Sequence, residues 1–148
     1  MLHYIIDGNN LIGKIDFLKN LEDKQSAREK LALILERFFT HKKVKVSLHF
    51  DGFENAPIKV SGIKIKYSFN NSADEIIKKE IENLRNTKSA VVISSDLEVI
   101  SFAKVCGCKV LKSEEFFNHL NQFETKKQNS EKPINFDTDE YKKLFGIE

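Results

Sequence analysis

The chain has 148 residues, 41% of them hydrophobic, and a formal net charge of +2. This length and composition predict one globular domain with a hydrophobic core of its own. The nearly balanced charge excludes a protein whose whole surface is basic. Any contact with nucleic acid must therefore come from a local group of the 24 Lys and Arg residues.

Two features bear on where the protein acts. Cys106 and Cys108 have no histidine partner at the spacing of a structural zinc site, which predicts free thiols in a reducing compartment. The N-terminus lacks the charged segment and long apolar run of a signal peptide, and no apolar stretch is long enough to cross a membrane. We therefore expect a cytoplasmic protein without a membrane partner.

Residues 3–12 open with a short, isoleucine-rich strand that runs into Asp7, Gly8 and two asparagines. Gly8 is expected to let the backbone turn sharply after the strand, where a Cβ would obstruct it. Asp7 then lies at the carboxyl end of a strand, where open α/β sheets bind ligands. An Asx turn that ends the strand explains the same residues, so a functional interpretation depends on whether later strands also end in acidic residues.

The next two elements repeat this pattern. After a short helix or turn over residues 11–18, apolar spacing predicts a helix over residues 22–40, with Arg28 on its charged outer face. Residues 44–50 predict a second strand, which also ends in an acidic residue and a glycine, at Asp51. Two strands of this kind, separated by a helix, place two carboxylates on the same rim of a parallel sheet.

Residues 63–69 alternate strictly between apolar and polar, which predicts an edge strand with Lys64 and Lys66 facing water. Lysines in this position usually protect a sheet edge, and phosphate binding is the alternative. The following helix starts at Ser72 with the spacing of a capping box. It carries Asp74 in its first turn, where the helix dipole alone explains an acidic residue.

The last predicted strands and helices bring a further carboxylate. Residues 89–94 are apolar and β-branched, typical of a buried parallel strand, and they lead to Asp96. A helix that ends at Gly107, a short strand over residues 108–111 and a helix from Ser113 complete the pattern.

From Glu124 to Pro133 the composition becomes polar, which predicts a linker. Some apolar character returns beyond it, which is compatible with a short helix. We therefore expect a domain over residues 1–123, followed by a polar linker and a short C-terminal tail over residues 124–148.

This order of elements predicts an α/β sandwich with a mainly parallel central sheet. Asp7, Asp51 and Asp96 end separate strands and Asp74 begins a helix, so four carboxylates converge on one rim. Their mutual repulsion raises their pKa values, and a bound cation removes this penalty. Oxygen ligands without Cys or His favour Mg²⁺ or Mn²⁺, and metal ions held in this way are suited to phosphodiester hydrolysis.

Five short motifs carry a resemblance to a known family. In order, they are residues 5–12 (IIDGNNLI), 50–52 (FDG), 72–77 (SADEII), 94–98 (SSDLE) and 111–116 (LKSEEF). Together they resemble the YacP-like branch of the NYN domain, within the PIN-like nucleases, over residues 1–123. The chain departs from that branch at Asn9, where the branch usually has tyrosine.

The resemblance implies a PIN-like three-layer α/β/α sandwich and a metal-dependent endoribonuclease that uses Mg²⁺ or Mn²⁺. Some members of the family act on RNA that is engaged with the ribosome. The family motif matches Asp7, Asp74 and Asp96 as catalytic metal ligands and Asn10 as the residue that steadies the site. Two more acidic residues near them, Asp51 and Glu98, are further candidate metal ligands.

Two functions are compatible with these residues. The first is an endoribonuclease that hydrolyses phosphodiester bonds in RNA, including mRNA engaged with the ribosome. The alternative is a non-catalytic module that binds RNA or the ribosome. The modest net charge and the departure at Asn9 favour it, and the retained carboxylates disfavour it. A phosphatase needs a second acid two residues after its nucleophile, a position that Asn9 occupies. In either RNA function, lysines near the rim are expected to bind the backbone phosphates: Lys14, Lys64, Lys66 and Lys112.

Overall fold

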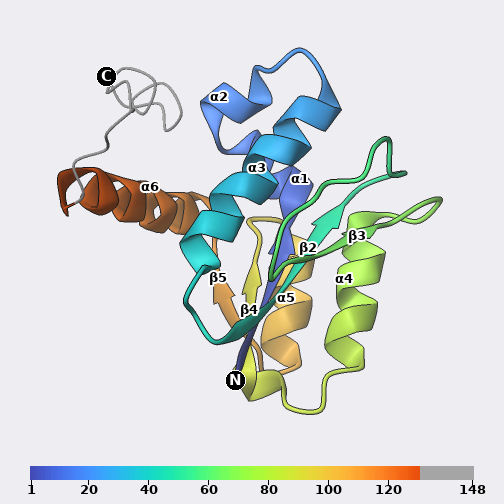
Figure 1. Ribbon diagram of the computed structural model, residues 1–148. Coiled ribbons are helices and arrows are strands. Elements are labelled where there is room, and N and C mark those ends of the chain that lie inside the picture. The colour runs from blue at the N-terminus through green and yellow to red at the C-terminus, as the bar shows by residue number, and fades with distance from the viewer. Residues whose placement is uncertain (131–148) are drawn as a thin grey trace.

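The computed structural model describes residues 1–130, with side chains described to residue 126. Its centre is a five-stranded sheet in which every neighbouring pair is parallel, in the order β3-β2-β1-β4-β5 (Figure 1). The prediction of a mainly parallel sheet is confirmed. The strands are β1 (Leu2–Asp7), β2 (Val44–Phe50), β3 (Lys64–Tyr67), β4 (Ala90–Ile93) and β5 (Lys109–Leu111).

Helices cover both faces of the sheet, which confirms the three-layer arrangement (Figure 1). Among residues 1–130, none of these helices is both long and apolar enough to span a lipid bilayer. One face carries α1 (Gly8–Gly13), α2 (Asp16–Lys19), α3 (Lys24–Phe39) and α6 (Ser113–Ser130), and the other carries α4 (Ala73–Glu82) and α5 (Leu97–Val105).

Alternating residues of β1 supply the two cores. Ile6 packs with Leu31 and Leu35 of α3 on one face, and Ile5 packs with Ile77 and Ile81 of α4 on the other. This is the two-residue period of a strand that is buried on both sides. It explains why the central strands read as apolar runs, whereas the edge strand β3 alternates with lysine.

The helix boundaries follow their capping residues. Asp23 accepts a hydrogen bond from the Ser26 N–H at 2.7 Å and starts α3. Ser72 accepts one from the Glu75 N–H at 3.2 Å and starts α4, as the capping-box spacing predicts. Capping therefore fixes the position of Asp74 in the first turn of α4.

The first and last helices have bounds that the sequence did not define. The first, α1, begins directly after β1, at Gly8. The polar segment from Glu124 is not a linker at its start, because α6 continues to Ser130. Glu124 is 2% exposed and lies 3.1 Å from the guanidinium of Arg37, which is partly exposed, so this ion pair holds the polar part of the helix on α3. The rest of the expected linker and tail, residues 131–148, lies outside the described residues.

The crossover from β2 to β3 contains no helix. Arg28 of α3 holds the start of this loop: it is 3% exposed, and its guanidinium donates hydrogen bonds to the carbonyls of Asp51 at 2.6 Å and Phe53 at 3.0 Å. The guanidinium also lies over the rings of Phe50 and Tyr67, each at 5.3 Å. The sequence predicted Arg28 on an outer face, but the loop covers it.

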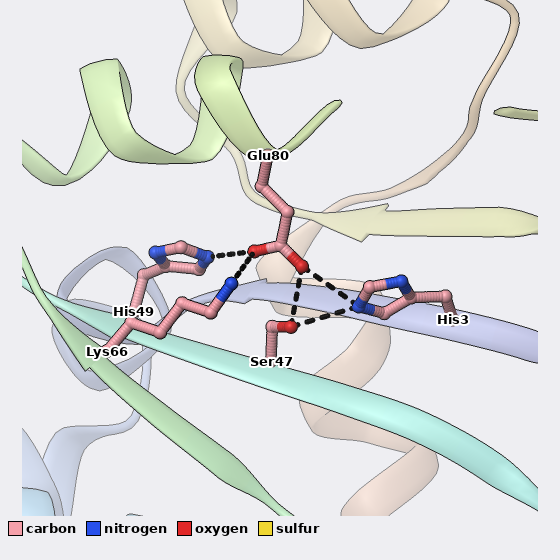
Figure 2. A network of polar contacts seen from close by, with 5 residues as sticks. All are labelled: His3, Ser47, His49, Lys66 and Glu80. Atoms are coloured by element: carbon pink, nitrogen blue, oxygen red, sulfur yellow. Dashed lines mark hydrogen bonds and ion pairs between the residues drawn. The ribbon is translucent and has the colours of Figure 1, made fainter. Parts of the chain in front are cut away.

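The face of the sheet under α4 is polar where β1, β2 and β3 meet. Figure 2 shows Glu80 of α4 between four side chains from these strands. Its carboxylate lies 2.6 Å from His49 Nε2 and 3.2 Å from Lys66 Nζ on one side. On the other side it accepts from the Ser47 hydroxyl at 2.6 Å and lies 2.9 Å from His3 Nε2. We call these five residues the Glu80 network.

The Glu80 network stabilises the ionised carboxylate. Burial alone raises the pKa of Glu80, but hydrogen bonds from His49 and Ser47, with the charges of His49 and Lys66, outweigh it and lower the pKa to about 2. One side chain is thereby bonded to three strands. The network fixes how α4 lies on the sheet, and α4 carries Asp74.

Replacing Glu80→Gln should lower the free energy of unfolding by about 3 kcal/mol at pH 7, because it removes the charged acceptor that the Glu80 network surrounds. The reference is Glu82→Gln, an exposed residue two positions along the same helix, which should change it by less than about 0.5 kcal/mol. Urea denaturation measures both.

The pH dependence provides a second check. A carboxyl group whose pKa is lowered on folding adds stability above its unfolded pKa near 4.5, and this stability is lost as the pH falls toward 2. The difference between wild type and Glu80→Gln should therefore shrink below pH 4.5. A difference that is equally large at pH 7 and pH 3 would contradict the role of the charge.

Candidate active site

The carboxyl ends of all five strands form one edge of the sheet, which we call the rim. Asp7 ends β1, Asp51 directly follows β2, and Asp96 lies three residues after β4. These three strands are neighbours, at a spacing of about 4.8 Å per strand. Connections leave in opposite directions from β1 and β4, which makes their ends the switch point where open α/β sheets bind ligands. The structure therefore brings these acids to the predicted place.

Asp7 is the buried member of this group, with 4% of its surface exposed. Its pKa is raised to about 6, mainly by burial and to a smaller extent by the nearby charges of Asp74 and Asp51. A hydrogen bond from the Ser94 hydroxyl, at 2.9 Å, partly opposes this shift. A carboxylate held in this way is costly to ionise at neutral pH, and perturbed carboxylates of this kind are typical of functional sites.

Asp74 links the remaining acids. Its pKa is raised by burial and then by the charges of Asp96, Asp51 and Glu98, with Lys78 opposing them. Because Asp74 also acts on Asp7, all five predicted metal ligands belong to one acidic region.

The acids do not form a closed metal site. Within the part of the chain whose side chains are described, no three His, Cys, Asp or Glu residues are placed to hold an ion together. Asp51 Oδ1 accepts the Ala73 N–H at 2.6 Å, and Asp96 Oδ1 accepts the N–H groups of Glu98 at 2.9 Å and Val99 at 3.3 Å. Both carboxylates therefore also serve as caps for helices.

A partly hydrated cation nevertheless suits these residues. Mg²⁺ keeps several waters and binds to one or two carboxylates directly, so it does not need a closed cage. The donors are all hard oxygen atoms, and the buried Asp7 carboxylate has acidic neighbours that raise its pKa. The chemistry of the oxygen donors is therefore what suits these residues to the cation, and water molecules supply its remaining ligands.

Two asparagines after Asp7 tie α1 to the loops of other strands. Asn9 Oδ1 accepts the Asp51 N–H at 2.8 Å, which fixes the loop after β2. Asn10 Oδ1 accepts the Ser95 N–H at 2.8 Å and the Ser113 hydroxyl at 2.7 Å. Asn10 thus connects α1 with the loop that carries Asp96 and with the start of α6, contacts suited to the steadying role predicted for it.

Gly8 allows this close arrangement, though not through an unusual backbone angle. A Cβ at Gly8 would lie 2.6 Å from the His49 carbonyl oxygen and 2.7 Å from the Phe50 ring. The glycine therefore lets α1 pack directly against β2. The chain thus passes from β1 into α1 at a point where a Cβ would obstruct it, as expected for Gly8.

The four predicted RNA-binding lysines lie in different surroundings. Lys14 and Lys112 are both exposed, and both help to lower the pKa of Glu114, after the hydrogen bond from Ser95. They therefore lie near each other at the β5 end of the rim. Lys64 is exposed on the edge strand, whereas Lys66 belongs to the Glu80 network.

Sequence reasoning missed several polar residues of the site and its support. Ser94 is fully buried and bonds to Asp7, and the buried Ser113 bonds to Asn10. A serine directly after an apolar strand was a usable signal for Ser94. For Glu80, the signal was the polar alternation of Ser47 and His49 in a central strand, which needs a polar partner on the covering helix.

We expect Asp7→Asn to stabilise the folded protein at neutral pH. A carboxyl group whose pKa is raised from 3.8 to about 6 on folding loses stability as the pH rises through this range. The neutral amide of Asp7→Asn should therefore raise the free energy of unfolding by up to about 3 kcal/mol above pH 6, and change it little below pH 4. Thermal melts from pH 4 to 8 measure the effect, with the exposed Asp16→Asn as the control. Equal stability of wild type and Asp7→Asn at pH 8 would contradict it.

Gly8→Ala should destabilise the protein by about 1–3 kcal/mol, because the new methyl group meets a backbone oxygen that cannot easily move. Gly13 lies in the same helix and has open space around it, so Gly13→Ala should be neutral or slightly stabilising. Denaturation of both variants measures the difference. If the two substitutions have the same effect, the close approach at Gly8 is not important.

Comparisons with known proteins support the fold. A crystal structure of Rae1 (YacP) from Bacillus subtilis is similar with a TM-score of 0.74 and 23% identity, over 88% of this chain and 79% of that one. A tryptophan-to-leucine mutant of the same protein is similar with a TM-score of 0.71 and 24% identity, over 97% of this chain and 92% of that one. No curated protein matches the chain.

The family assignment rests on the sequence. The model of the YacP-like NYN domain matches residues 4–144, which is most of the chain. The chain therefore belongs to the YacP-like NYN domain family, which is part of a nuclease superfamily.

Proposed function

We propose that the protein is a metal-dependent endoribonuclease that hydrolyses phosphodiester bonds in RNA. The observation that carries the proposal is the burial of Asp7 among acids from other elements, at the switch point of the sheet. This arrangement raises the pKa of Asp7, and a cation offsets the penalty. Membership of a nuclease superfamily agrees with this use of the site.

In this proposal Asp7, Asp74 and Asp96 hold Mg²⁺ or Mn²⁺, directly or through water, with Asp51 and Glu98 as outer carboxylates. When bound, such an ion lowers the pKa of a coordinated water and neutralises charge on the phosphate. The chain's own task is to keep these oxygens in place. Asn10 does so by holding the loop before Asp96.

The substrate must meet the rim with its phosphates. Lys14 and Lys112 are exposed near the acids and are the best placed of the four lysines to bind the RNA backbone. Since some members of the family act on RNA engaged with the ribosome, cytoplasmic mRNA on the ribosome is the substrate we would test first.

Single-residue variants separate catalysis from folding. Asp7→Asn removes a charge that destabilises the fold, and Asp96→Asn keeps a good helix cap while removing a carboxylate. Each should lower the rate of RNA cleavage in Mn²⁺ at least about 100-fold, in line with the loss of electrostatic stabilisation at an active site. The assay uses end-labelled RNA and maps the product ends, which should be 5′-phosphate and 3′-hydroxyl. Full activity of Asp7→Asn in buffered Mn²⁺ would refute the proposal.

A non-catalytic RNA-binding module is the second candidate, because no three acids are placed to hold an ion together among the residues with described side chains. Titration with Mn²⁺ distinguishes the two. RNA binding by a protein that takes up no divalent ion and cleaves no RNA favours the module.

A further inference from the structure

Two phenylalanines next to the acidic region are exposed as a pair. Phe53 follows Asp51 by two residues, and Phe69 lies in the loop after β3. Their side chains are 55% and 59% exposed, with ring centroids 5.6 Å apart and the planes at 71°. Single exposed apolar residues are common, but two aromatic rings in contact at the edge of a site require an explanation.

The backbone holds Phe69 in a conformation that disfavours its side chain. Its φ is +56°, in the left-handed region that bulky residues rarely adopt. Three hydrogen bonds keep it there: Phe69 N–H to the Gly52 carbonyl at 2.9 Å, Ser68 N–H to the Phe50 carbonyl at 3.1 Å, and Gly52 N–H to the Ser68 hydroxyl at 2.8 Å. Because the ring is mostly exposed, burial does not compensate for this strain. Strain of this kind is found most often at functional positions.

The same contacts fix the pair relative to the acids. The loop that carries Phe53 is held by Arg28 through the carbonyls of Asp51 and Phe53, and by Asn9 through the Asp51 N–H. The loop that carries Phe69 leads directly into α4, whose first backbone N–H, at Ala73, binds the Asp51 carboxylate. The two rings are therefore built onto the acidic region and do not belong to a separate surface.

The strand order gives the rim a direction. From β3 to β5, the residues at or after the strand ends are Phe69, Asp51, Asp7, Asp96 and Lys112. An aromatic pair thus lies at one end of the rim, exposed lysines lie at the other, and the carboxylates lie between them. These are the groups that bind a nucleic acid strand: rings for its bases, carboxylates with a cation for one phosphate, and lysines for its backbone.

We propose that Phe53 and Phe69 form a stacking platform for an unpaired base beside the phosphate that is cleaved, so that the substrate is single-stranded RNA. This inference rests on the proposed function and names the substrate class of that site. A base stacked inside a duplex does not expose its face, whereas every unpaired base does. The platform therefore distinguishes single-stranded from double-stranded RNA. It accepts any base, because stacking needs no base-specific hydrogen bond.

Phe69→Gly provides the sharpest test, because it removes the ring and also relieves the positive φ, so the fold should be retained. Phe53→Ala removes the other ring, and Phe69→Trp restores an aromatic face. The control is Leu33→Ala, which removes a 51% exposed apolar side chain from α3. Melting temperatures of all variants verify that they are folded.

The first measurement is binding of a short fluorescein-labelled single-stranded RNA, in chelator to prevent cleavage. Phe69→Gly and Phe53→Ala should weaken binding roughly five- to 100-fold, while Phe69→Trp and Leu33→Ala bind like wild type. Removing the one base that stacks on the rings should weaken binding of the RNA to wild type as much as Phe69→Gly does. The same abasic RNA should bind to Phe69→Gly about as tightly as the intact RNA does. Wild-type affinity of both ring-removal variants overturns the platform.

Cleavage in Mn²⁺ distinguishes the two proposals. Wild type should cut the single strand and spare the same RNA annealed to its complement, and the loss of either ring should reduce this preference. If wild type cleaves both forms equally and the ring variants do the same, the platform is wrong and the nuclease stands. If binding depends on the rings but no RNA is cut, the nuclease is wrong, and the two rings bind an unpaired base without cleavage.

Discussion

The arrangement depends on one costly placement, an aspartate buried at the carboxyl end of the central strand of a parallel sheet. Asp7 ends the middle strand of the sheet and is 4% exposed, so its carboxylate is shielded from solvent. The surrounding acids raise its pKa, and a serine hydroxyl offsets only part of the effect. Perturbed carboxylates of this kind cluster at functional sites. The acidic rim, the loops that frame it and the helices that support those loops are all organised around this residue.

The supporting contacts come from polar side chains and not from the hydrophobic cores. Asn9 and Asn10 reach from α1 to the loops after β2 and β4. Glu80 reaches from α4 to three strands, and Arg28 reaches from α3 to the crossover loop. Directional bonds of this kind define one geometry, whereas apolar packing tolerates small displacements. Apolar residues hold the layers together, and these few polar residues set the positions of the acids within them.

Local patterns were sufficient to predict the layers, the parallel sheet and the acidic rim. Strands that are buried on both faces read as apolar runs, and an acidic residue recurs just after three of them, so convergence follows from the topology alone. The patterns failed where distant segments meet. Arg28 has the helical spacing of an outer face, yet a loop that begins 23 residues later covers it. Glu124 reads as the start of a linker because its partner, Arg37, lies far away in the sequence. The φ of Phe69 depends on a hydrogen bond to another loop, which no local propensity contains.

The helix-free crossover between β2 and β3 has a consequence for how relatives of this chain can diverge. Arg28 binds its first residues, Gln25 and Glu36 bind the Ala56 carbonyl and the Ser61 N–H, and its last residues lead into an edge strand. The crossover is therefore held on α3 at a few separate points. Lengthening a loop is inexpensive, at about 0.6 kcal/mol of closure entropy for each doubling. Insertions in this segment leave the sheet register and the acids untouched while changing the surface beside them. Among homologues we therefore expect differences in loop length to concentrate here, while the acidic residues of the rim stay the same.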